Sequence, residues 1–192
     1  MWPILLGYLA GSVPFAFLLA RRAGIDVRFA GSGNVGAANV MRTTGTRRAI
    51  LVMSLDVAKG ALAVALALVV HAGVTLTALA AAAAVVGHIY PVWLRFHGGK
   101  GVAVAAGVFA VLSPIATALA AGLFLVIVWL TRYVSLGSIA ATVALPPAAW
   151  ITGEPIAVVL AAAGSGGLIL FRHRGNIRRL REGTERRMGV RV

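Results

Sequence analysis

Long apolar stretches alternate with short polar segments along the whole chain. Near-continuous apolar runs occupy six ranges: Trp2–Ala20, Ile50–His71, Val74–Leu94, Val102–Leu130, Leu136–Ile151 and Pro155–Phe171. A helix of about 20 apolar residues crosses the hydrocarbon core of a bilayer, which is about 30 Å thick. The pattern therefore predicts an all-α integral membrane protein.

The fourth run is too long for one ordinary span. As a single helix, Val102–Leu130 would extend about 44 Å, and Ser113 and Pro114 interrupt its middle. The run is either one span, giving six in total, or two spans, giving seven. In the second case the fourth helix, from about Gly101 to Ser113, covers only about 20 Å and must be tilted or partly immersed.

The positions of the basic residues favour seven spans, because Lys and Arg collect in the cytoplasmic loops of membrane proteins. With seven spans, one face receives Arg21, Arg22, Arg28, Arg42, Arg47, Arg48, Arg95, Lys100, Arg132 and the C-terminal arginines. The opposite connections, around Ala72–Gly73, Ser113–Pro114 and Thr152–Glu154, contain no Lys or Arg. We expect seven transmembrane helices, with the N-terminus outside and the C-terminus in the cytoplasm. The first run precedes its first charges, unlike a signal peptide, and is expected to be retained.

Composition limits the chemistry. Hydrophobic residues make up 60% of the 192 residues, and 18 Lys and Arg oppose 5 Asp and Glu. This balance suits anionic lipid, nucleic acid or phosphorylated ligands. Cysteine is absent, which excludes a cysteine nucleophile, and no cluster of His, Asp and Glu has the spacing of metal ligands. We expect no metal and no cofactor. We also expect a single domain over residues 1–192, because neither a repeat nor a linker divides the chain.

Three polar segments, Ala30–Gly45, Gly87–Ala103 and Arg172–Glu185, fall on the predicted cytoplasmic face and suggest one site. The first contains Gly31, Gly33 and Gly36 in the spacing of a dinucleotide fingerprint, but no strand precedes it, so that fold is excluded. Glycines still let backbone N–H groups bind an anion, and the same segment adds polar side chains from Ser32, Asn34, Asn39 and Arg42. The alternative is a plain glycine-rich connector.

The second segment places Lys100 between Gly98, Gly99 and Gly101 at the start of an apolar run. It is not a nucleotide-binding P-loop, because Leu94 stands at the position of the first glycine and Gly101 follows the lysine. A helix N-terminus with an adjacent lysine favours phosphate. The segment therefore predicts a phosphate-binding turn, and a lysine snorkelling to the interface is the weaker alternative.

The third segment is rich in arginine. His173 and Asn176 share a helix face if the helix continues, and the flanking Arg172 and Arg174 favour a neutral imidazole that can accept a proton. The remaining arginines are expected to form a basic tail on anionic lipid: Arg178, Arg179, Arg181, Arg186 and Arg187.

Two further groups of polar residues lie inside predicted spans. Asp56 and Lys59 are three residues apart, and intramembrane charges are functional candidates, although a structural ion pair is favoured. His88 and Pro91 are open to two interpretations: a buried histidine before a helix terminator, or a catalytic pair.

Together and in order, these segments resemble the bacterial acyl-phosphate-dependent glycerol-3-phosphate acyltransferases. The matching pieces are Gly31–Arg42, Asp56–Gly60, Gly87–Ala103, Arg132–Ile139 and Arg172–Glu185, which cover nearly the whole chain. Small departures are Val35 in place of a common proline, and Ala38 and Val104 in place of threonines.

The resemblance implies transfer of an acyl chain from acyl phosphate to the 1-hydroxyl of sn-glycerol 3-phosphate, giving lysophosphatidic acid and inorganic phosphate. It implies a multi-pass protein of the bacterial inner membrane, with seven spans and an active-site groove on the cytoplasmic face. Expected partners are the two substrates and membrane lipid, with neither nucleic acid nor an obligate protein partner.

The resemblance also assigns roles to residues. It ties Ser32, Arg42, His173 and Asn176 to catalysis, the turn of Gly98, Gly99, Lys100 and Gly101 to glycerol 3-phosphate, and Glu185 to structural integrity. Asn34 and Asn39 are expected to contact phosphate, while Asp56, Lys59, His88 and Ser135 are expected to support the site. The His-x-x-x-x-Asp pattern of acyl-CoA-dependent enzymes is absent.

Two points stay open at this stage. The general base is either His173 or a phosphate oxygen of a substrate, and Ser32 is expected to hydrogen-bond substrate and not to form an acyl-enzyme. Outside the acyltransferases, a permease for phosphorylated anions or a noncatalytic lipid-binding scaffold would also use a basic face. The outer connections offer a permease almost no polar groups.

Overall fold

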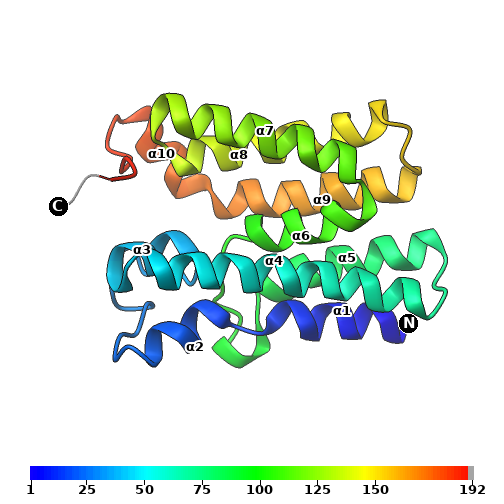
Figure 1. The fold of residues 1–192 in the computed structure, drawn as a ribbon, viewed down its shortest axis with the longest axis horizontal. Coiled ribbons are helices and arrows are strands. Elements are labelled where there is room, and N and C mark those ends of the chain that lie inside the picture. Colours follow the sequence, from blue (N-terminus) through cyan, green and yellow to red (C-terminus); the bar gives the residue numbers. More distant parts are fainter. Residues whose placement is uncertain (190–192) are drawn as a thin grey trace. The chain divides into compact units, whose positions relative to one another are not determined.

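A computed structural model describes residues 1–189 and is helical throughout its regular structure (Figure 1). Residues 1–112 form one compact unit, and the chain from Ser113 onward forms a second. The first unit contains α1 (Trp2–Ser12), α2 (Phe15–Arg21), α3 (Ala37–Thr44), α4 (Thr46–Val69), α5 (Val74–Ile89), the short 3-10 helix η1 (Val92–Leu94) and α6 (Val102–Leu112). The second contains α7 (Pro114–Thr131), α8 (Val134–Ile151), α9 (Ile156–Arg172) and α10 (Arg174–Arg181).

Several of these helices are long and apolar enough to cross a membrane. Among residues 1–189, five segments meet this criterion by length and composition: Trp2–Arg21, Thr46–Val69, Val74–Leu94, Pro114–Thr131 and Val134–Ile151. The pair α9 and α10, bent by 57°, is a sixth candidate if counted as one span. The helix α6 is apolar but has 11 residues, about 16 Å. The predicted all-α membrane architecture and the break at Ser113 are confirmed.

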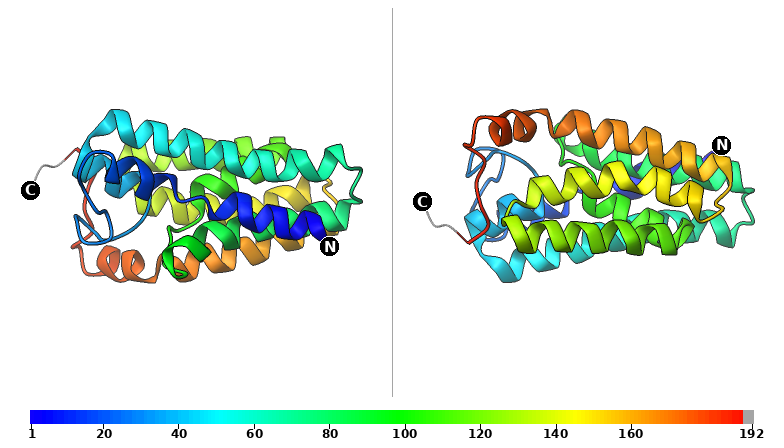
Figure 2. Two further views of the ribbon diagram at one scale, coloured as in Figure 1. Left: turned by 90° about the horizontal axis from the view of Figure 1, so that it is seen from below. Right: turned by 90° about the horizontal axis from the view of Figure 1, so that it is seen from above.

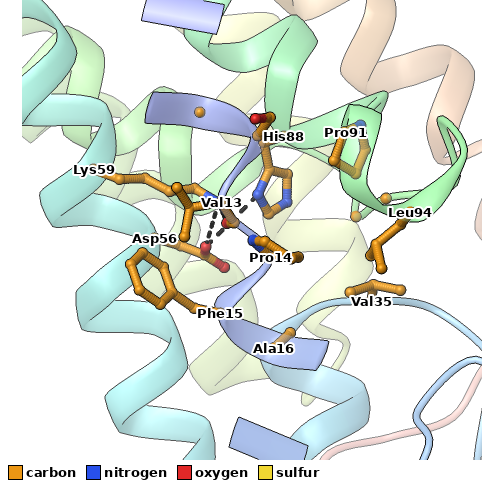
Figure 3. Close-up of a pocket in the computed structure, with 14 residues that line it drawn as sticks. Val13, Pro14, Phe15, Ala16, Val35, Asp56, Lys59, His88, Pro91 and Leu94 are labelled. Atoms are coloured by element: carbon orange, nitrogen blue, oxygen red, sulfur yellow. Dashed lines mark hydrogen bonds and ion pairs between the residues drawn. The ribbon is translucent and has the colours of Figure 1, made fainter. Parts of the chain in front are cut away.

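The first apolar run is broken, which the sequence analysis did not predict. The helix α1 ends at Ser12 and α2 begins at Phe15, because Pro14 lacks an N–H and disfavours helical geometry in the residue before it. The carbonyl oxygen of Val13 instead accepts a hydrogen bond from Lys59 Nζ at 2.7 Å (Figure 3). The helix α5 ends at Ile89, two residues before Pro91, which agrees with the interpretation of Pro91 as a helix terminator.

Glycine allows the helices of the first unit to approach closely. Along the contact between α1 and α5, a Cβ on Gly7 or Gly11 would overlap the backbone carbonyl of Ala80 or Ala84. Figure 2 shows α1 running beside α4 and α5. Small residues at helix contacts are a usual means of packing in membranes, where apolar burial against lipid gives little driving force.

The contact between α4 and α6 has the same character. A Cβ on Gly60 would overlap the carbonyl oxygen of Val104, and one on Gly107 would overlap that of Val57. These reciprocal contacts fix α6 against α4, and with it the turn that precedes α6.

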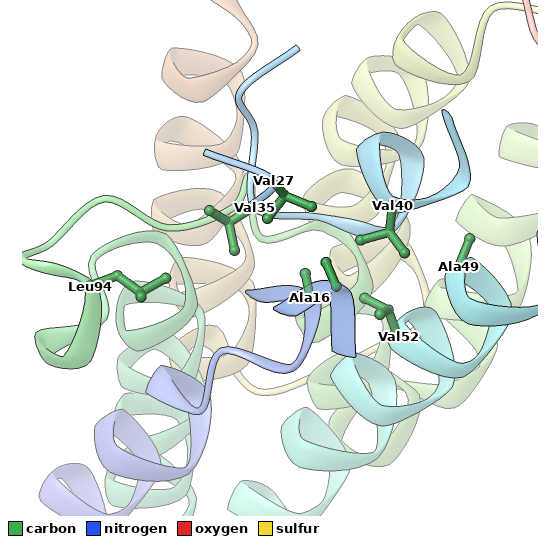
Figure 4. Close-up of a cluster of buried hydrophobic side chains, with 8 residues drawn as sticks. Ala16, Val27, Val35, Val40, Ala49, Val52 and Leu94 are labelled. Carbon is green, nitrogen blue, oxygen red and sulfur yellow. The ribbon is translucent and has the colours of Figure 1, made fainter. Parts of the chain in front are cut away.

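A buried apolar cluster holds the connection between α2 and α3 against the helices (Figure 4). It joins residues from α2, the connection, α3, α4 and η1: Ala16, Ala20, Val27, Val35, Val40, Ala49, Val52 and Leu94. The first glycine-rich segment is thus anchored on both sides of its polar residues. The helix α3, which the sequence analysis did not predict, begins after Gly36 and ends before Gly45.

In the second unit, α8 packs between α7 and α9, and α10 contacts both α8 and α9. The chain after α10 folds back on the turn between α7 and α8. There the Met188 N–H donates to the Arg132 carbonyl at 2.8 Å, and Arg187 Nε donates to the Tyr133 hydroxyl at 3.2 Å. This return places Glu185 next to α8 and α10.

The substitution Gly107→Ala should destabilise the protein by about 1–3 kcal/mol, because the added methyl group overlaps the backbone of α4. Thermal unfolding in one detergent would measure the effect. The control is Gly122→Ala on α7, where a Cβ meets no atom of the structure within 4 Å. Equal unfolding temperatures for the two variants would contradict the close packing.

Candidate functional site

The glycine-rich loop before α3 is folded around the side chain of Asn39. Its Oδ1 accepts the Ser32 backbone N–H at 2.8 Å, and its Nδ2 donates to the carbonyl oxygens of Val27 and Ala30, both at 3.0 Å. Asn39 is almost completely buried, with 1% exposure. Both amide hydrogens are therefore used within the loop. This geometry favours a positioning role for Asn39 over the direct phosphate contact expected from the sequence.

The same loop presents Ser32 on the surface. The neighbouring Gly31 and Gly33 have φ values of +64° and +71°, and a Cβ on Gly31 would overlap the Asn39 amide oxygen. Ser32 is exposed, Asn34 is half-buried beside Gly36, and Arg42 is exposed on α3. The loop thus presents the Ser32 hydroxyl at the surface and is fixed from below by the Asn39 side chain. The following helix adds the guanidinium of Arg42.

An ion pair between Asp26 and Arg28 closes the start of the connection between α2 and α3. Arg28 Nη2 lies 2.6 Å from Asp26 Oδ2 and its Nε donates to Oδ1 at 2.9 Å, while Arg21 lies 3.9 Å from the same carboxylate. The Arg28 hydrogen bonds and charge lower the pKa of Asp26 to about 2. Asp26 is therefore ionised at neutral pH and its charge is matched locally.

The second segment forms a turn that is hydrogen-bonded to the end of α5. The N–H of Gly98 donates to the Ile89 carbonyl at 3.1 Å, and the N–H of Gly99 donates to the His88 carbonyl at 3.2 Å. Both carbonyls are available because the helix stops before Pro91. Gly101, with φ +93°, then leads into α6.

Lys100 is half-buried between this turn and the start of α6. Lys100 directly precedes Gly101 and the helix α6, whose first backbone N–H groups have no helical acceptor. A phosphate at this position would meet a full positive charge together with the positive end of the helix dipole.

The first unit brings the first two polar segments together. Gly99 lies against both the Val35 carbonyl oxygen, from the loop before α3, and the His88 ring, so a Cβ on Gly99 would overlap both. The predicted convergence of these two segments is confirmed. It depends on a glycine at position 99, since any side chain would push the loop and the turn apart.

The predicted ion pair inside the span is also present. Lys59 Nζ lies 2.8 Å from Asp56 Oδ1, with side-chain exposures of 5% and 3%, and His88 Nδ1 lies 3.7 Å from the same oxygen. Figure 3 shows these groups around a small cavity that Val13 and Pro91 also line. The cavity lining includes Gly98 and Gly99, so the ion pair lies directly behind the glycine turn.

In the second unit, His173 occupies the bend between α9 and α10 and is 2% exposed. Its Nδ1 lies 2.8 Å from the Ile169 carbonyl oxygen. A carbonyl oxygen only accepts hydrogen bonds, so Nδ1 carries the proton of this bond. In the neutral ring, Nε2 is then the nitrogen that can take up a proton, as expected for a base.

A second buried polar group surrounds Glu185. Its Oε1 accepts hydrogen bonds from Ser135 Oγ at 2.8 Å and from Asn176 Nδ2 at 2.7 Å, and its Oε2 accepts from Arg179 Nε at 2.7 Å. These contacts give Glu185 and Ser135 a physical means of supporting Asn176. The Asn176 amide is oriented with its nitrogen toward the carboxylate and its oxygen away from it.

Sequence analysis missed part of this arrangement. It assigned Arg179 and Arg187 to a lipid-facing tail, but Arg179 binds Glu185 and Arg187 binds Tyr133. It also missed the contact from Lys59 to Val13. Pro14 is the signal in the sequence that could have predicted the helix break, whereas no local pattern pairs Arg179 with Glu185.

The neighbours of Glu185 shift the pKa of its carboxyl group. Burial alone raises the pKa of Glu185, but the hydrogen bonds from Asn176, Ser135 and Arg179 together lower it by more, so the pKa lies below its ordinary value of 4.5. The ionised carboxylate is therefore the form that the folded protein favours.

Within residues 1–189, no group of three or more His, Asp and Glu side chains is arranged to hold a metal ion.

Replacing Glu185 by Gln should lower the unfolding temperature by an amount that corresponds to about 2 kcal/mol, because the hydrogen bonds lose their charge and one acceptor becomes a donor. Any activity that depends on Asn176 should fall as well, since Asn176 loses its fixed orientation. The matched control is Glu182→Gln, whose exposed carboxylate lies 4.0 Å from Arg178. Equal effects at the two positions would contradict the supporting role of Glu185.

A pH dependence follows from the lowered pKa of Glu185. Ionised Glu185 stabilises the fold above pH 4.5, and this contribution is lost as the pH falls below 4.5 and through the lowered pKa. Between about pH 6 and about pH 3, the unfolding temperature of the native chain should fall more than that of Glu185→Gln. Parallel curves would show that Glu185 does not contribute in this way.

Comparison with known proteins agrees with the arrangement in both units. The family model described as glycerol-3-phosphate acyltransferase matches residues 1–183. The chain is 46% identical over 188 residues to a glycerol-3-phosphate acyltransferase of Rubrobacter xylanophilus, covering 98% of this chain and 94% of the relative. It is 44% identical to a protein of the same name from Thermus thermophilus, covering 100% and 96% of the two chains.

Two crystal structures of PlsY, described as an integral membrane glycerol 3-phosphate acyltransferase, are similar over 98% of this chain and 94% of their own. The glycerol 3-phosphate form has a TM-score of 0.94 and 40% identity, and the lysophosphatidic acid form has 0.91 and 39%. On these grounds, the chain belongs to the glycerol-3-phosphate acyltransferase family.

Proposed function

We propose that this protein transfers an acyl chain from acyl phosphate to the 1-hydroxyl of sn-glycerol 3-phosphate, releasing lysophosphatidic acid and inorganic phosphate. Family membership supports the acceptor and the product, which are also the ligands named for the two PlsY forms. The observation that carries the proposal is the Gly98–Lys100 turn, which is held against the loop of Ser32 through Gly99 and Val35. Two glycine-rich anion sites therefore adjoin each other, as a reaction between two phosphorylated substrates requires.

The turn is assigned to the acceptor. Lys100 and the first N–H groups of α6 bind the phosphate of glycerol 3-phosphate, because an ammonium group and a helix N-terminus both favour a dianion. Gly98 and Gly99 let the backbone approach that phosphate closely. Asn34, from the adjacent loop, is assigned a supporting hydrogen bond.

The loop is assigned to the donor. Ser32 hydrogen-bonds the acyl phosphate, and Arg42 presents a planar pair of donors to its phosphate oxygens. No histidine or carboxylate occurs between Gly31 and Gly45, so Ser32 has no base within its own segment that would make it a nucleophile. Acyl phosphate is already activated, and the protein has mainly to align the substrates and stabilise developing charge.

The reaction is direct. The 1-hydroxyl oxygen attacks the acyl carbon, the bond from that carbon to the phosphate oxygen breaks, and phosphate leaves with the bonding electron pair. The hydroxyl proton goes to His173 Nε2 or to a phosphate oxygen of a substrate, the two acceptors that the chemistry offers. Asn176, oriented by Glu185, supports the reacting groups through its amide.

The proposed enzyme crosses the bacterial plasma membrane seven times, with α6 as a short span and the active-site groove on the cytoplasmic face. The distribution of charge supports this topology, since the connections at Ala72–Gly73, Ser113–Pro114 and Thr152–Glu154 carry no Lys or Arg. In the first unit, α3 and the arginines at the start of α4 lie at the end opposite to the α4–α5 turn (Figure 1).

An assay of the purified protein in lipid tests the reaction. With palmitoyl phosphate and glycerol 3-phosphate, equal amounts of lysophosphatidic acid and inorganic phosphate should form, whereas palmitoyl-CoA should not serve as donor. Product from palmitoyl-CoA alone would overturn the donor assignment. If neither donor gives product and sealed vesicles take up glycerol 3-phosphate, the protein is a permease instead.

The substitution Lys100→Ala should raise the KM for glycerol 3-phosphate by about 10-fold to 100-fold, because the phosphate loses its charged partner. Steady-state kinetics with each substrate varied in turn would measure this. The control is Arg47→Ala, which removes an exposed cation at the start of α4. An unchanged KM in Lys100→Ala would reject the assigned role.

A further inference from the structure

We infer that His88 is a positioning residue for the glycerol 3-phosphate turn, and that the buried Asp56–Lys59 pair holds its ring in place. The inference rests on the proposed function, because it takes the Gly98–Lys100 turn as the phosphate site. It assigns the intramembrane charges a role in substrate binding that they exert through a third side chain.

The backbone of α5 provides the first connection between His88 and the turn. The carbonyl oxygens of His88 and Ile89 accept the N–H groups of Gly99 and Gly98, at 3.2 and 3.1 Å. These two bonds form because α5 stops at Ile89. The last residues of α5 therefore fix the backbone of the turn through these two hydrogen bonds.

The side chain of His88 provides the second connection. On one side, its ring lies so close to Gly99 that a Cβ there would overlap Nε2. On the other side, Nδ1 lies 3.7 Å from Asp56 Oδ1. The ring, which is 8% exposed, thus lies between the carboxylate and the glycine. Figure 3 shows the ring beside Asp56.

The carboxylate behind the ring is itself fixed. Lys59 Nζ binds Asp56 at 2.8 Å and donates to the Val13 carbonyl at 2.7 Å, and it lies 5.6 Å from the centre of the Phe15 ring. The pair is therefore attached to the break between α1 and α2 as well as to α4. A chain of contacts runs from that break through Lys59, Asp56 and His88 to Gly99.

A buried ion pair is weak evidence for stability, because an apolar pair of similar volume often stabilises a protein as well or better. Its specific effect is the fixed place that it gives to neighbouring groups. A turn that shifts by about 1 Å can lower a rate by about 100-fold when it positions a substrate. The Asp56–Lys59 pair and His88 prevent such a shift by filling the space behind Gly99.

Two variants of His88 separate positioning from packing. His88→Ala removes the ring, whereas His88→Gln retains a side chain whose amide can reach the place of Nε2 against Gly99. In His88→Ala the KM for glycerol 3-phosphate should rise about 10-fold with a smaller change in kcat, and His88→Gln should recover most of the loss. The control is His71→Asn at the α4–α5 turn, where φ is +52° and Asn is well tolerated.

The double variant Asp56→Leu with Lys59→Met tests the ion pair without leaving an unpaired charge. Its unfolding temperature should equal or exceed that of the native chain, while the KM for glycerol 3-phosphate should rise about 10-fold. An unchanged KM in this folded variant and in His88→Ala would overturn the inference.

Amide hydrogen exchange gives a readout that does not depend on catalysis. Exchange at Gly98 and Gly99 should become at least about 10-fold faster in His88→Ala and in the double variant, with exchange in α8 unchanged. If the native chain forms no product, the proposed function fails, and the exchange rates still decide whether His88 holds the turn. Equal exchange at both glycines in all the chains would overturn the inference even if the enzyme is active.

Discussion

A backbone polar group inside a membrane must find its partner within the protein, and this constraint explains where the helices break and what lies at each break. The carbonyl of Val13, freed by Pro14, takes Lys59 Nζ as its donor. The carbonyls at the end of α5 take the N–H groups of Gly98 and Gly99. At the bend between α9 and α10, the Ile169 carbonyl takes the Nδ1 of His173. Each of these three interruptions is closed by a group that belongs to the candidate site or holds it in place.

The breaks are also what make phosphate chemistry possible in so apolar a chain. A continuous helix pairs its N–H groups internally, whereas the break before α6 leaves the first N–H groups of that helix without a helical acceptor, next to Lys100. The glycine loop and the glycine turn of the first unit carry Ser32 and Lys100. Gly99 joins these two elements, because it alone leaves room for the Val35 carbonyl and the His88 ring. With a formal charge of +13, the chain is suited to two anionic substrates at an anionic membrane surface.

Much of this organisation could be predicted from the sequence. Runs of apolar residues located the helices, Pro114 located the break before α7, and glycine spacing located the loop and the turn. What the sequence does not show is which distant groups meet. Asn39 looks like a phosphate ligand until its amide is found inside the loop, and Arg179 looks like a lipid contact until Glu185 returns to it. Such pairings depend on how whole helices pack, which local periodicity does not record.

The central claim is that the Lys100 turn binds the phosphate of glycerol 3-phosphate. The chain has two lysines, Lys59 and Lys100, so nitrogen-15 labelling of lysine gives two side-chain signals, of which Lys59 is an internal control in its buried ion pair. Solid-state NMR in lipid can measure the coupling of each Nζ to the phosphorus of bound glycerol 3-phosphate, with Lys100→Arg assigning the signals. The account predicts coupling to Lys100 at a distance of about 4 Å and none to Lys59. Absence of coupling to Lys100 in the saturated protein would contradict it.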